Sequence, residues 1–448
     1  MKRPHSQCSD ADSSQPATQP IPEESSHSSP GKLKPIHDRV YGQIKLEPLL
    51  ISVLDTPQCQ RLAEIKQLGG SSYVYPSANH TRKEHSIGVA HLAGVAATHL
   101  RDSQPELCID DEDILCVKLA GLVHDIGHGP FSHMFEEFIH KYGSELAAKG
   151  ETEEAREQAR EKARPFIEWT HERMCEPILR QLIEDPANGI RLADYFKESD
   201  PDERLRFVVA LVNGLDDDEP WPSDLGPELE AKRFLFDIVN NKRNGIDVDK
   251  LDYLARDALA AGLSSSGVGG ALRIINASKV LRSSEGGALQ LGYEMKASRC
   301  TKATRGPALL ALVASHRLTP CGPRCSQVAQ DVKKVFDQRT EQHQSLYKHR
   351  VVHVVETMIT DILTLANPAF RYRGGGGKPT SLTDAAVAED CASYVLLNDT
   401  VVEQIYTSVQ PGLVRSSTSN APPFVGRQGI VPLRLALLCS LAATAVSS

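Results

Sequence analysis

The chain has 448 residues, of which 40% are hydrophobic and 24% charged, as in ordinary globular proteins. Its formal net charge of −8 excludes an overall basic footprint for nucleic acid, although a phosphate pocket needs only a few local cations. Ten cysteines are scattered along the chain, and the N-terminus lacks the apolar core of a signal peptide. We therefore expect reduced thiols and a location in the nucleus, the cytoplasm or both.

Composition divides the chain into helical stretches and stretches of low complexity. Residues 1–33 are rich in Ser, Pro and acidic residues and are expected to be disordered. Residues 34–298 and 335–411 have the texture of a helical core, whereas 299–334 have no clear pattern and are interpreted as an insertion. Residues 412–448 are expected to be a disordered tail.

The tail contains the one long apolar run of the sequence, residues 429–446. It includes Arg434, and its Ala, Ser and Thr content makes it only weakly hydrophobic. A membrane anchor is therefore the less favoured interpretation, and we expect no membrane partner.

The first ordered stretch is predicted to hold a hairpin and two helices. Residues 34–50 alternate polar and apolar side chains, which predicts a short pair of strands. Thr56 followed by Pro57 is typical of a helix start. A later helix carries Arg82 and His85, which are three residues apart and therefore share a face. A lone histidine on a helix is more often a surface or core residue than a ligand, so the next stretch decides its meaning.

That stretch, VKLAGLVHDIGHGPFSH (residues 117–133), joins an apolar helix to a crowded polar exit. Apolar residues recur at helical spacing up to His124 and Asp125, and glycines and a proline then break the helix. Burying such an end costs free energy unless the ionisable groups are paired or bind a metal. Imidazole and carboxylate together suit a divalent cation, and two adjacent ligands cannot complete its shell. His128 and His133 crowd the same exit.

Two later stretches offer further polar groups. His171 follows a predicted helix start at Thr170, where it could face an anion or simply lie at the surface. Asp249, Tyr253 and Asp257 are spaced i, i+4 and i+8, so they line one face of an otherwise apolar helix. That face is either an ion-paired surface or the wall of a site in which Asp249 completes the metal shell.

A third stretch follows residue 335, where the helical texture returns. Arg339, His343, Tyr347 and Arg350 are three or four residues apart, which predicts one polar face of a single helix.

The set formed by His85, His124-Asp125 and Asp249 resembles the HD superfamily of metal-dependent phosphohydrolases. Flanking segments such as LAGLVHDIGHGPFSHMFE and NKRNGIDVDKLDYLARD resemble the eukaryotic SAM-and-HD-domain deoxynucleoside triphosphate triphosphohydrolases. The resemblance covers roughly residues 34–262 and 335–410. It implies a mainly α fold, in which an HD-domain helical core carries a short N-terminal β-hairpin and minor strands.

The resemblance also implies a reaction. A dNTP is cleaved at its α-phosphate to a deoxynucleoside and inorganic tripolyphosphate, which lowers dNTP pools. The metal (Zn, Fe, Mn or Mg) polarises the phosphate and lowers the pKa of its bound water. The implied metal ligands are His85, His124, Asp125 and Asp249. Histidine titrates near neutrality, so His133, with His128 or His171, can pass a proton to the leaving oxygen.

Further positions match the family's substrate contacts. The resemblance assigns the triphosphate to Arg82, Lys250 and Arg339, and the sugar 3′-hydroxyl to Gln67 and Asp257. Leu68, Tyr253 and Tyr347 would crowd the sugar, so that a ribonucleotide hydroxyl finds neither room nor a partner.

Other features of the family are only partly matched. An activator site for GTP or dGTP, which assembles a tetramer in the family, is matched by Lys34, Asp55, Gln60, His349 and Arg350. Ala63 and His37 stand where the family has arginine and asparagine, and the SAM domain and C-terminal lobe have no counterpart in the sequence. The sequence therefore leaves activation and tetramer assembly open.

Two other functions stay open as well. The first is a protein that binds nucleotides, or weakly binds single-stranded nucleic acid, without turnover. The second is an HD phosphodiesterase for another ester, which would leave Gln67, Tyr253, Asp257 and Tyr347 without a role.

Overall fold

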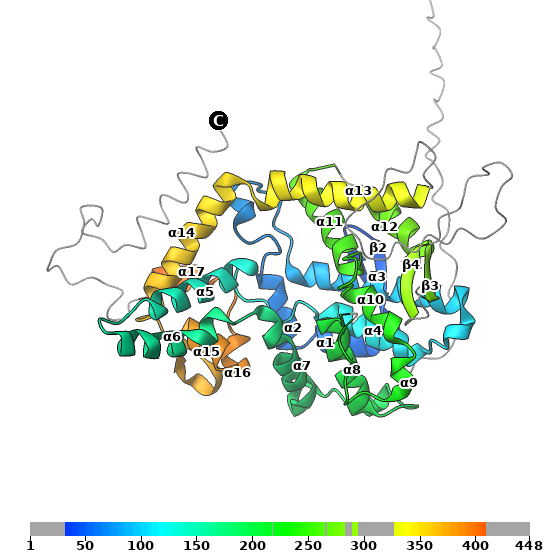
Figure 1. Ribbon diagram of the computed structural model, residues 1–448, viewed down its shortest axis with the longest axis horizontal. Helices are drawn as coiled ribbons and strands as arrows, with labels where there is room; N and C mark the ends of the chain where they lie inside the picture. Colours follow the sequence, from blue (N-terminus) through cyan, green and yellow to red (C-terminus); the bar gives the residue numbers. More distant parts are fainter. Residues whose placement is uncertain (1–31, 217, 265–266, 283–288, 294–326, 409–448) are drawn as a thin grey trace, which may run out of the picture.

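The computed structural model describes residues 32–216, 218–264, 267–282, 289–293 and 327–408. In these ranges the chain is mainly helical, with three small two-stranded antiparallel sheets, as the sequence predicts (Figure 1). Most of the segments expected to be disordered or inserted lie outside the described residues. No helix within the described ranges is both long enough and apolar enough to cross a membrane.

The first half of the chain supplies the hairpin and the longest helix, α3. The strands are β1 (Lys34–Asp38) and β2 (Gly42–Leu46). The α-helices are α1 (Pro48–Leu54), α2 (Pro57–Gln60), α3 (Arg82–Ser103), α4 (Asp111–Val123), α5 (His133–Ala147), α6 (Glu153–Ile167), α7 (Cys175–Glu184) and α8 (Pro201–Asn213). Short 3-10 turns between them are η1 (Arg61–Glu64), η2 (Gly69–Tyr73), η3 (Pro105–Leu107), η4 (His171–Met174), η5 (Pro186–Asn188) and η6 (Leu192–Asp194).

The second half adds a further helical layer and four short strands. Its α-helices are α9 (Pro227–Glu230), α10 (Phe236–Val239), α11 (Val248–Ala261), α12 (Gly267–Asn276), α13 (Gln327–Gln342), α14 (Arg350–Ala366), α15 (Leu382–Val387), α16 (Cys391–Tyr394) and α17 (Val401–Thr407). The strands are β3 (Ser278–Arg282), β4 (Leu289–Tyr293), β5 (Tyr372–Arg373) and β6 (Pro379–Thr380). The remaining turns are the 3-10 turns η7 (Arg233–Leu235) and η9 (Gly375–Gly377) and the π-turn η8 (His343–Tyr347).

The predicted N-terminal hairpin is confirmed. Strands β1 and β2 pair antiparallel with Ile36 opposite Ile44. The Asp38 carboxylate accepts the backbone N–H groups of Val40 and Tyr41, which closes the turn. The predicted helix start at Thr56 and Pro57 is confirmed as well, because Thr56 caps α2 through the N–H of Cys59.

Helices α3 and α4 cross closely at the centre of the core. Gly121 makes the approach feasible, since a Cβ atom there would lie 3.1 Å from backbone atoms of Ala90. A capping box between Asp110 and Asp113 fixes the start of α4. The crossing brings His85 of α3 beside His124, the residue that ends α4.

One prediction is wrong, namely that a single helix carries Arg339, His343, Tyr347 and Arg350 on one face. Helix α13 ends at Gln342, the π-turn η8 follows, and α14 begins only at Arg350. The π-turn changes the number of residues per turn, so helical spacing no longer relates the four side chains. Helix α13 also begins at Gln327, within the segment interpreted as an insertion.

The last helices return to the early part of the chain. Helix α14 packs on α5 and η2, α15 on α6, α16 on α7, and α17 on α14. In Figure 1 these orange and yellow elements lie beside the teal helices α5 and α6. Buried tyrosine and leucine side chains, including Tyr394 and Leu397, join this layer to the main core.

Candidate active site

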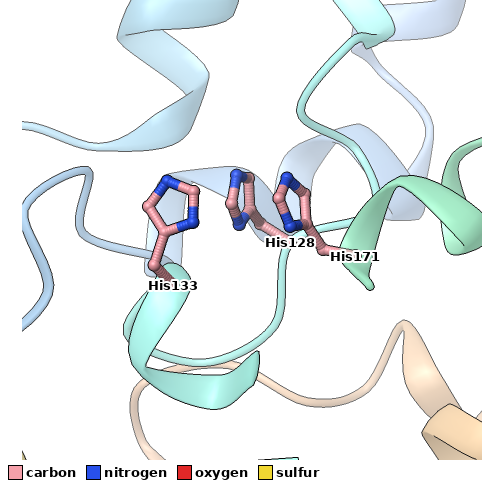
Figure 2. A group of neighbouring side chains, drawn as sticks. All are labelled: His128, His133 and His171. Carbon is pink, nitrogen blue, oxygen red and sulfur yellow. The ribbon is translucent and has the colours of Figure 1, made fainter. Parts of the chain in front are cut away.

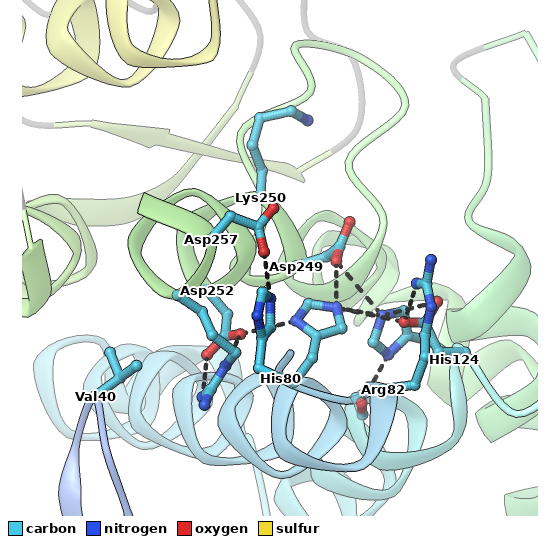
Figure 3. Close-up of polar contacts among 12 residues, drawn as sticks. Val40, His80, Arg82, His124, Asp249, Lys250, Asp252 and Asp257 are labelled. Carbon is cyan, nitrogen blue, oxygen red and sulfur yellow. Dashed lines mark hydrogen bonds and ion pairs between the residues drawn. The ribbon is translucent and has the colours of Figure 1, made fainter. Parts of the chain in front are cut away.

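Four predicted metal ligands converge on one point. His85 Nε2 lies 3.0 Å from Asp249 Oδ1 and 3.5 Å from Asp125 Oδ2. His124 Nε2 lies 3.4 Å from the same Asp249 oxygen and 3.5 Å from Asp125 Oδ1. Figure 3 shows His124 from the lower helices and Asp249 from α11 pointing toward each other. One ligand atom each from His85, His124 and Asp125 lies within 4.8 Å of the others.

The donor set fits a divalent cation. His124 Nδ1 donates to the carbonyl of Gly121 at 2.8 Å, and His85 Nδ1 pairs with Asp252 at 2.7 Å. In the neutral rings both Nε2 atoms therefore present lone pairs, and these atoms are 3.2 Å apart. Two lone pairs and two carboxylates facing one another favour a shared positive charge, which a divalent cation would supply.

Without a metal the same groups compete for protons. Burial lowers the pKa of His85, but hydrogen bonds to Asp249 and Asp252 outweigh it and raise the pKa to about 10. Burial would raise the pKa of Asp249, but His124 and His85 hold it below its usual range. The two carboxylates thus favour positive charge at this point of the structure.

A buried chain of ion pairs orients His85, and the sequence analysis missed it. Asp252 receives two hydrogen bonds from Arg256, at 2.9 and 3.0 Å, and Arg256 also binds Asp38 at 2.9 Å. Gly88 makes room for this chain, because a Cβ atom there would fall 2.0 Å from Asp252 Oδ1. The spacing of Asp252 and Arg256 by four residues was the available signal.

The three predicted proton-transfer histidines form a second cluster. The rings of His128 and His171 stack with centroids 3.7 Å apart, and the ring of His133 meets both edge-on (Figure 2). His171 Nδ1 pairs with Glu136 at 2.7 Å, a partner that the sequence analysis did not single out. The two clusters share Asp125, because its Oδ1 lies 3.3 Å from His128 Nε2.

Burial and neighbouring cations keep two of these rings neutral. Burial, Arg82 and His171 together lower the pKa of His128 well below its ordinary value. The same influences lower the pKa of His133 to about 4. A bound polyphosphate would oppose this shift, because negative charge nearby favours a protonated imidazole.

Arg82 joins the metal ligands to the turn that carries His133. Its Nη1 donates to Asp125 Oδ2 at 2.6 Å, and its Nε donates to Ser132 Oγ at 2.8 Å. Phe131 and Ser132 both have positive φ angles, 58° and 62°, which non-glycine residues adopt only under constraint. The turn also approaches η4 closely, since a Cβ atom on Gly127 would fall 2.1 Å from the carbonyl oxygen of His171.

The residues predicted to hold the sugar are only partly together. Asp257 lies 2.7 Å from His80 Nε2 and 2.7 Å from the Tyr347 hydroxyl, and the ring of Tyr347 meets Tyr253 edge-on. Gln67 is buried, and its side-chain oxygen has no hydrogen-bond partner, so it is free to meet a ligand. Leu68 follows it and is half-buried. Buried His80 is the member that the sequence analysis missed.

The other predicted triphosphate contacts lie further out. Lys250 donates to the carbonyl of Gly245 and extends away from His124 in Figure 3. Arg339 is exposed on α13 and hydrogen-bonds Tyr253. Lys250 also pairs with Asp247 at 3.8 Å, whereas Arg82 is held against the metal ligands.

The predicted activator residues fall into two groups. Lys34 and Asp55 form an exposed pair at 3.7 Å, and Gln60 donates to the carbonyl of Leu54 beside them. His349 caps α14 and contacts the ring of Tyr75, and Arg350 follows it on the surface.

The helical core and the converging ligands define an HD-domain protein, and the family model for the HD domain matches residues 82–209. Such a domain implies a divalent metal. The human deoxynucleoside triphosphate triphosphohydrolase SAMHD1 is 36% identical over 386 residues, which are 85% of this chain and 52% of that protein. The SAMHD1 homologue of Dictyostelium discoideum is 29% identical over 390 residues, 87% of this chain and 58% of that protein.

The chain belongs to the SAMHD1-like family of HD-domain proteins. It spans about half the length of the curated relatives it matches.

Proposed function

We propose that the protein is a metal-dependent dNTP triphosphohydrolase, which cleaves dNTPs at the α-phosphate to a deoxynucleoside and tripolyphosphate. The observation that carries the proposal is the sharing of Asp125 between two clusters. One side of this carboxylate meets His85 and Arg82, and the other meets His128. A cation site and a proton-transfer site are thereby adjacent, as hydrolysis of a phosphate ester requires.

The four converging residues would hold the metal. When bound, a divalent cation supplies Lewis-acid polarisation of the scissile phosphate. Asp252 and the carbonyl of Gly121 fix the two histidine rings in the orientation that ligation needs.

Residues beside the metal ligands would protonate the leaving group and stabilise the negative charge that develops on the phosphate. We assign the proton donated to the departing 5′-oxygen to His133, whose neighbours His128 and His171 form the route for its replacement. Glu136 orients His171. Arg82 places fixed positive charge where the phosphate would gain negative charge, and such preorganised charge lowers the barrier.

The sugar set supports a deoxyribonucleotide substrate. Asp257, ordered by His80 and Tyr347, together with the free side-chain oxygen of Gln67, offers acceptors for a 3′-hydroxyl. The paired rings of Tyr253 and Tyr347 would leave a 2′-hydroxyl without room or partner. The names of the relatives agree with this substrate class.

A product assay tests the proposal. The purified full chain is incubated with dATP and Mn²⁺ or Mg²⁺, and the products are separated by ion-exchange chromatography. Tripolyphosphate and deoxyadenosine, absent with His124→Ala and present with His353→Ala, are expected; His353 is exposed on α14. Pyrophosphate or single phosphate would refute cleavage at the α-phosphate, and dATP retained without turnover would identify a binding protein.

The exposed pair of Lys34 and Asp55, with half-buried Gln60 beside it, supports a guanine-nucleotide activator site as part of the same proposal. The assay is therefore repeated with GTP, and gel filtration follows the molecular mass. A rise in both rate and mass is expected. Neither rising would reject activation by assembly without affecting the hydrolysis proposal.

A further inference from the structure

The turn that carries the proton-transfer histidines is bonded to a segment far along the chain. Residues 394–399, which we name the C-terminal brace, contact residues 126–133, which we name the histidine turn. The Tyr394 hydroxyl donates to the carbonyl of Gly127 at 2.8 Å. The brace lies outside the residues that the HD domain model matches.

A buried arginine makes the second connection. Arg61 donates to the carbonyls of Ile126, at 2.9 Å, and His128, at 2.8 Å, on the turn. The same guanidinium donates to the carbonyl of Leu397 in the brace at 3.1 Å. Its charge also lies over the ring of Tyr394, 5.3 Å from the centroid.

Asp399 makes the third connection, at the most constrained point of the turn. Its Oδ1 accepts the N–H of Phe131 at 2.6 Å, and its Oδ2 accepts the N–H of Lys66 at 3.0 Å. Its own N–H donates to the carbonyl of Glu64. One carboxylate therefore holds together the positive-φ turn before His133 and the strand-like segment that leads into Gln67.

The histidine turn and the segment at Lys66 are also joined directly through Ser132, which in turn contacts Arg82. Ser132 Oγ donates to the carbonyl of Lys66 at 2.7 Å and accepts from Arg82 Nε. Two consecutive non-glycine residues with positive φ angles persist only where surrounding bonds over-determine them. Asp399 supplies the acceptor for the first of these residues.

We propose that Asp399, in the C-terminal brace, is a positioning residue that sets His133 relative to the metal ligands. The inference rests on the proposed function for its effect on turnover, but its effect on the turn itself does not. Asp399 touches neither the metal ligands nor the histidine rings in the contacts described above. It acts through the backbone of Phe131 and through the Ser132–Arg82 bond.

The test compares Asp399→Asn with Asp390→Asn in the full chain. An asparagine at position 399 keeps the shape but offers one acceptor oxygen, so its amide would meet one of the two N–H donors with a donor. Asp390 is the matched control, because it lies four residues before the brace and its carboxylate, among the described residues, accepts hydrogen bonds only from Ser393. Asparagine is also an accepted helix cap, so the control should fold.

We expect kcat for dATP to fall roughly 10- to 100-fold in Asp399→Asn, as small misplacements of catalytic groups do, with metal content unchanged. Amide hydrogen exchange in peptides covering residues 126–133 should accelerate in Asp399→Asn and not in Asp390→Asn. An unchanged kcat would overturn the proposal, and so would unchanged exchange. If wild-type protein hydrolyses no dNTP, the proposed function fails, while the exchange comparison still decides whether the brace holds the turn.

A double-mutant cycle separates positioning from general loosening. If Asp399 acts through His133, adding Asp399→Asn to His133→Ala should cause little further loss of kcat. Losses that multiply would reject action through His133. Should Asp399→Asn fail to fold, Tyr394→Phe removes only the hydroxyl bonded to Gly127. This variant should then show the same faster exchange with a smaller loss of kcat, and protection equal to wild type would overturn the proposal.

Discussion

The Nε2 atoms of His85 and His124 lie 3.2 Å apart, and each ring is held by a hydrogen bond from its other nitrogen. Neutral imidazoles oriented in this way repel each other unless a positive charge lies between them. The arrangement is therefore favourable only with positive charge beside these two atoms, either a metal ion or, without one, the proton held by His85, whose pKa is raised. On the proposed function, we expect both the stability and the activity of the protein to depend on the metal.

Removing a metal ligand should abolish both effects. We expect His124→Ala to lose metal after chelation and reloading, and to lose hydrolysis, because three ligands bind far more weakly than four. Wild-type protein should gain about 2.7 kcal/mol of stability at a metal concentration 100 times the dissociation constant. Elemental analysis and thermal unfolding with and without Mn²⁺ measure this. His353→Ala, an exposed histidine variant, should behave as wild type, and equal metal content in His124→Ala would contradict the assignment.

The orientation of His85 should affect metal affinity without removing a ligand. Asp252→Asn weakens the hydrogen-bond acceptor for His85 Nδ1 and removes a negative charge that compensates Arg256. Loss of such an outer partner typically lowers metal affinity by about 10- to 100-fold. Competition with a fluorescent chelator gives the dissociation constant. Asp337→Asn, which changes an exposed pair with Lys333, should leave the affinity unchanged, and a similar shift in both variants would point to a nonspecific effect.

Glu356 should make stability depend on pH. Burial raises the pKa of Glu356 to about 7, with a smaller raising effect from Glu137. A raised pKa means that the contribution to stability is present below about pH 4.5 and is lost as pH rises through 7. Glu356→Gln should therefore gain relative to wild type, by roughly 3 kcal/mol at pH 8 and little at pH 4.5.

Urea unfolding at the two pH values tests this expectation. Glutamine can still accept the N–H of Gly70, which bonds to Glu356 at 3.2 Å, so the comparison isolates the charge. A difference in unfolding free energy that does not change with pH would show that Glu356 titrates normally.

The sugar set should respond to loss of a single hydroxyl. The Tyr347 hydroxyl lies 2.7 Å from Asp257 and 2.8 Å from Gln342. Tyr347→Phe leaves the buried Asp257 carboxylate with one fewer hydrogen-bond donor. We expect the transition state for dATP to lose about 1–2 kcal/mol of stabilisation, so kcat/KM should fall roughly 10-fold. Steady-state kinetics compare it with Tyr406→Phe, at a half-exposed position on α17. Equal kcat/KM in the two variants would remove Tyr347 from the site.

Much of the candidate site could be predicted from local pattern. Spacing alone placed Asp249, Tyr253 and Asp257 on one face of α11, and the glycines after Asp125 marked the end of α4. The identity of the ligand set came from its resemblance to a family. The structure then brings the four ligand side chains, which come from distant segments, within reach of one another.

The remainder depends on contacts between distant segments. In the sequence, Asp252 and Arg256 look like ordinary surface charges on one helix. Only the approach of Asp38 and His85 from distant segments makes them part of a buried chain of ion pairs. The break between α13 and α14 was missed because helical spacing continues through the sequence while the π-turn shifts the backbone. Asp399 carries no local signal, since its partners are 268 and 333 residues away.

The contacts of Arg61 constrain the order in which the protein can fold during its synthesis. Its partners include Ile126, at a separation of 65 residues, and Leu397, at a separation of 336 residues. Ribosomes deliver the early helices long before residue 397 emerges, and contacts over such separations form slowly. On the proposed function, the nascent chain can therefore place His85 and His124 early but should hydrolyse dNTPs only after the brace has been synthesised and docked.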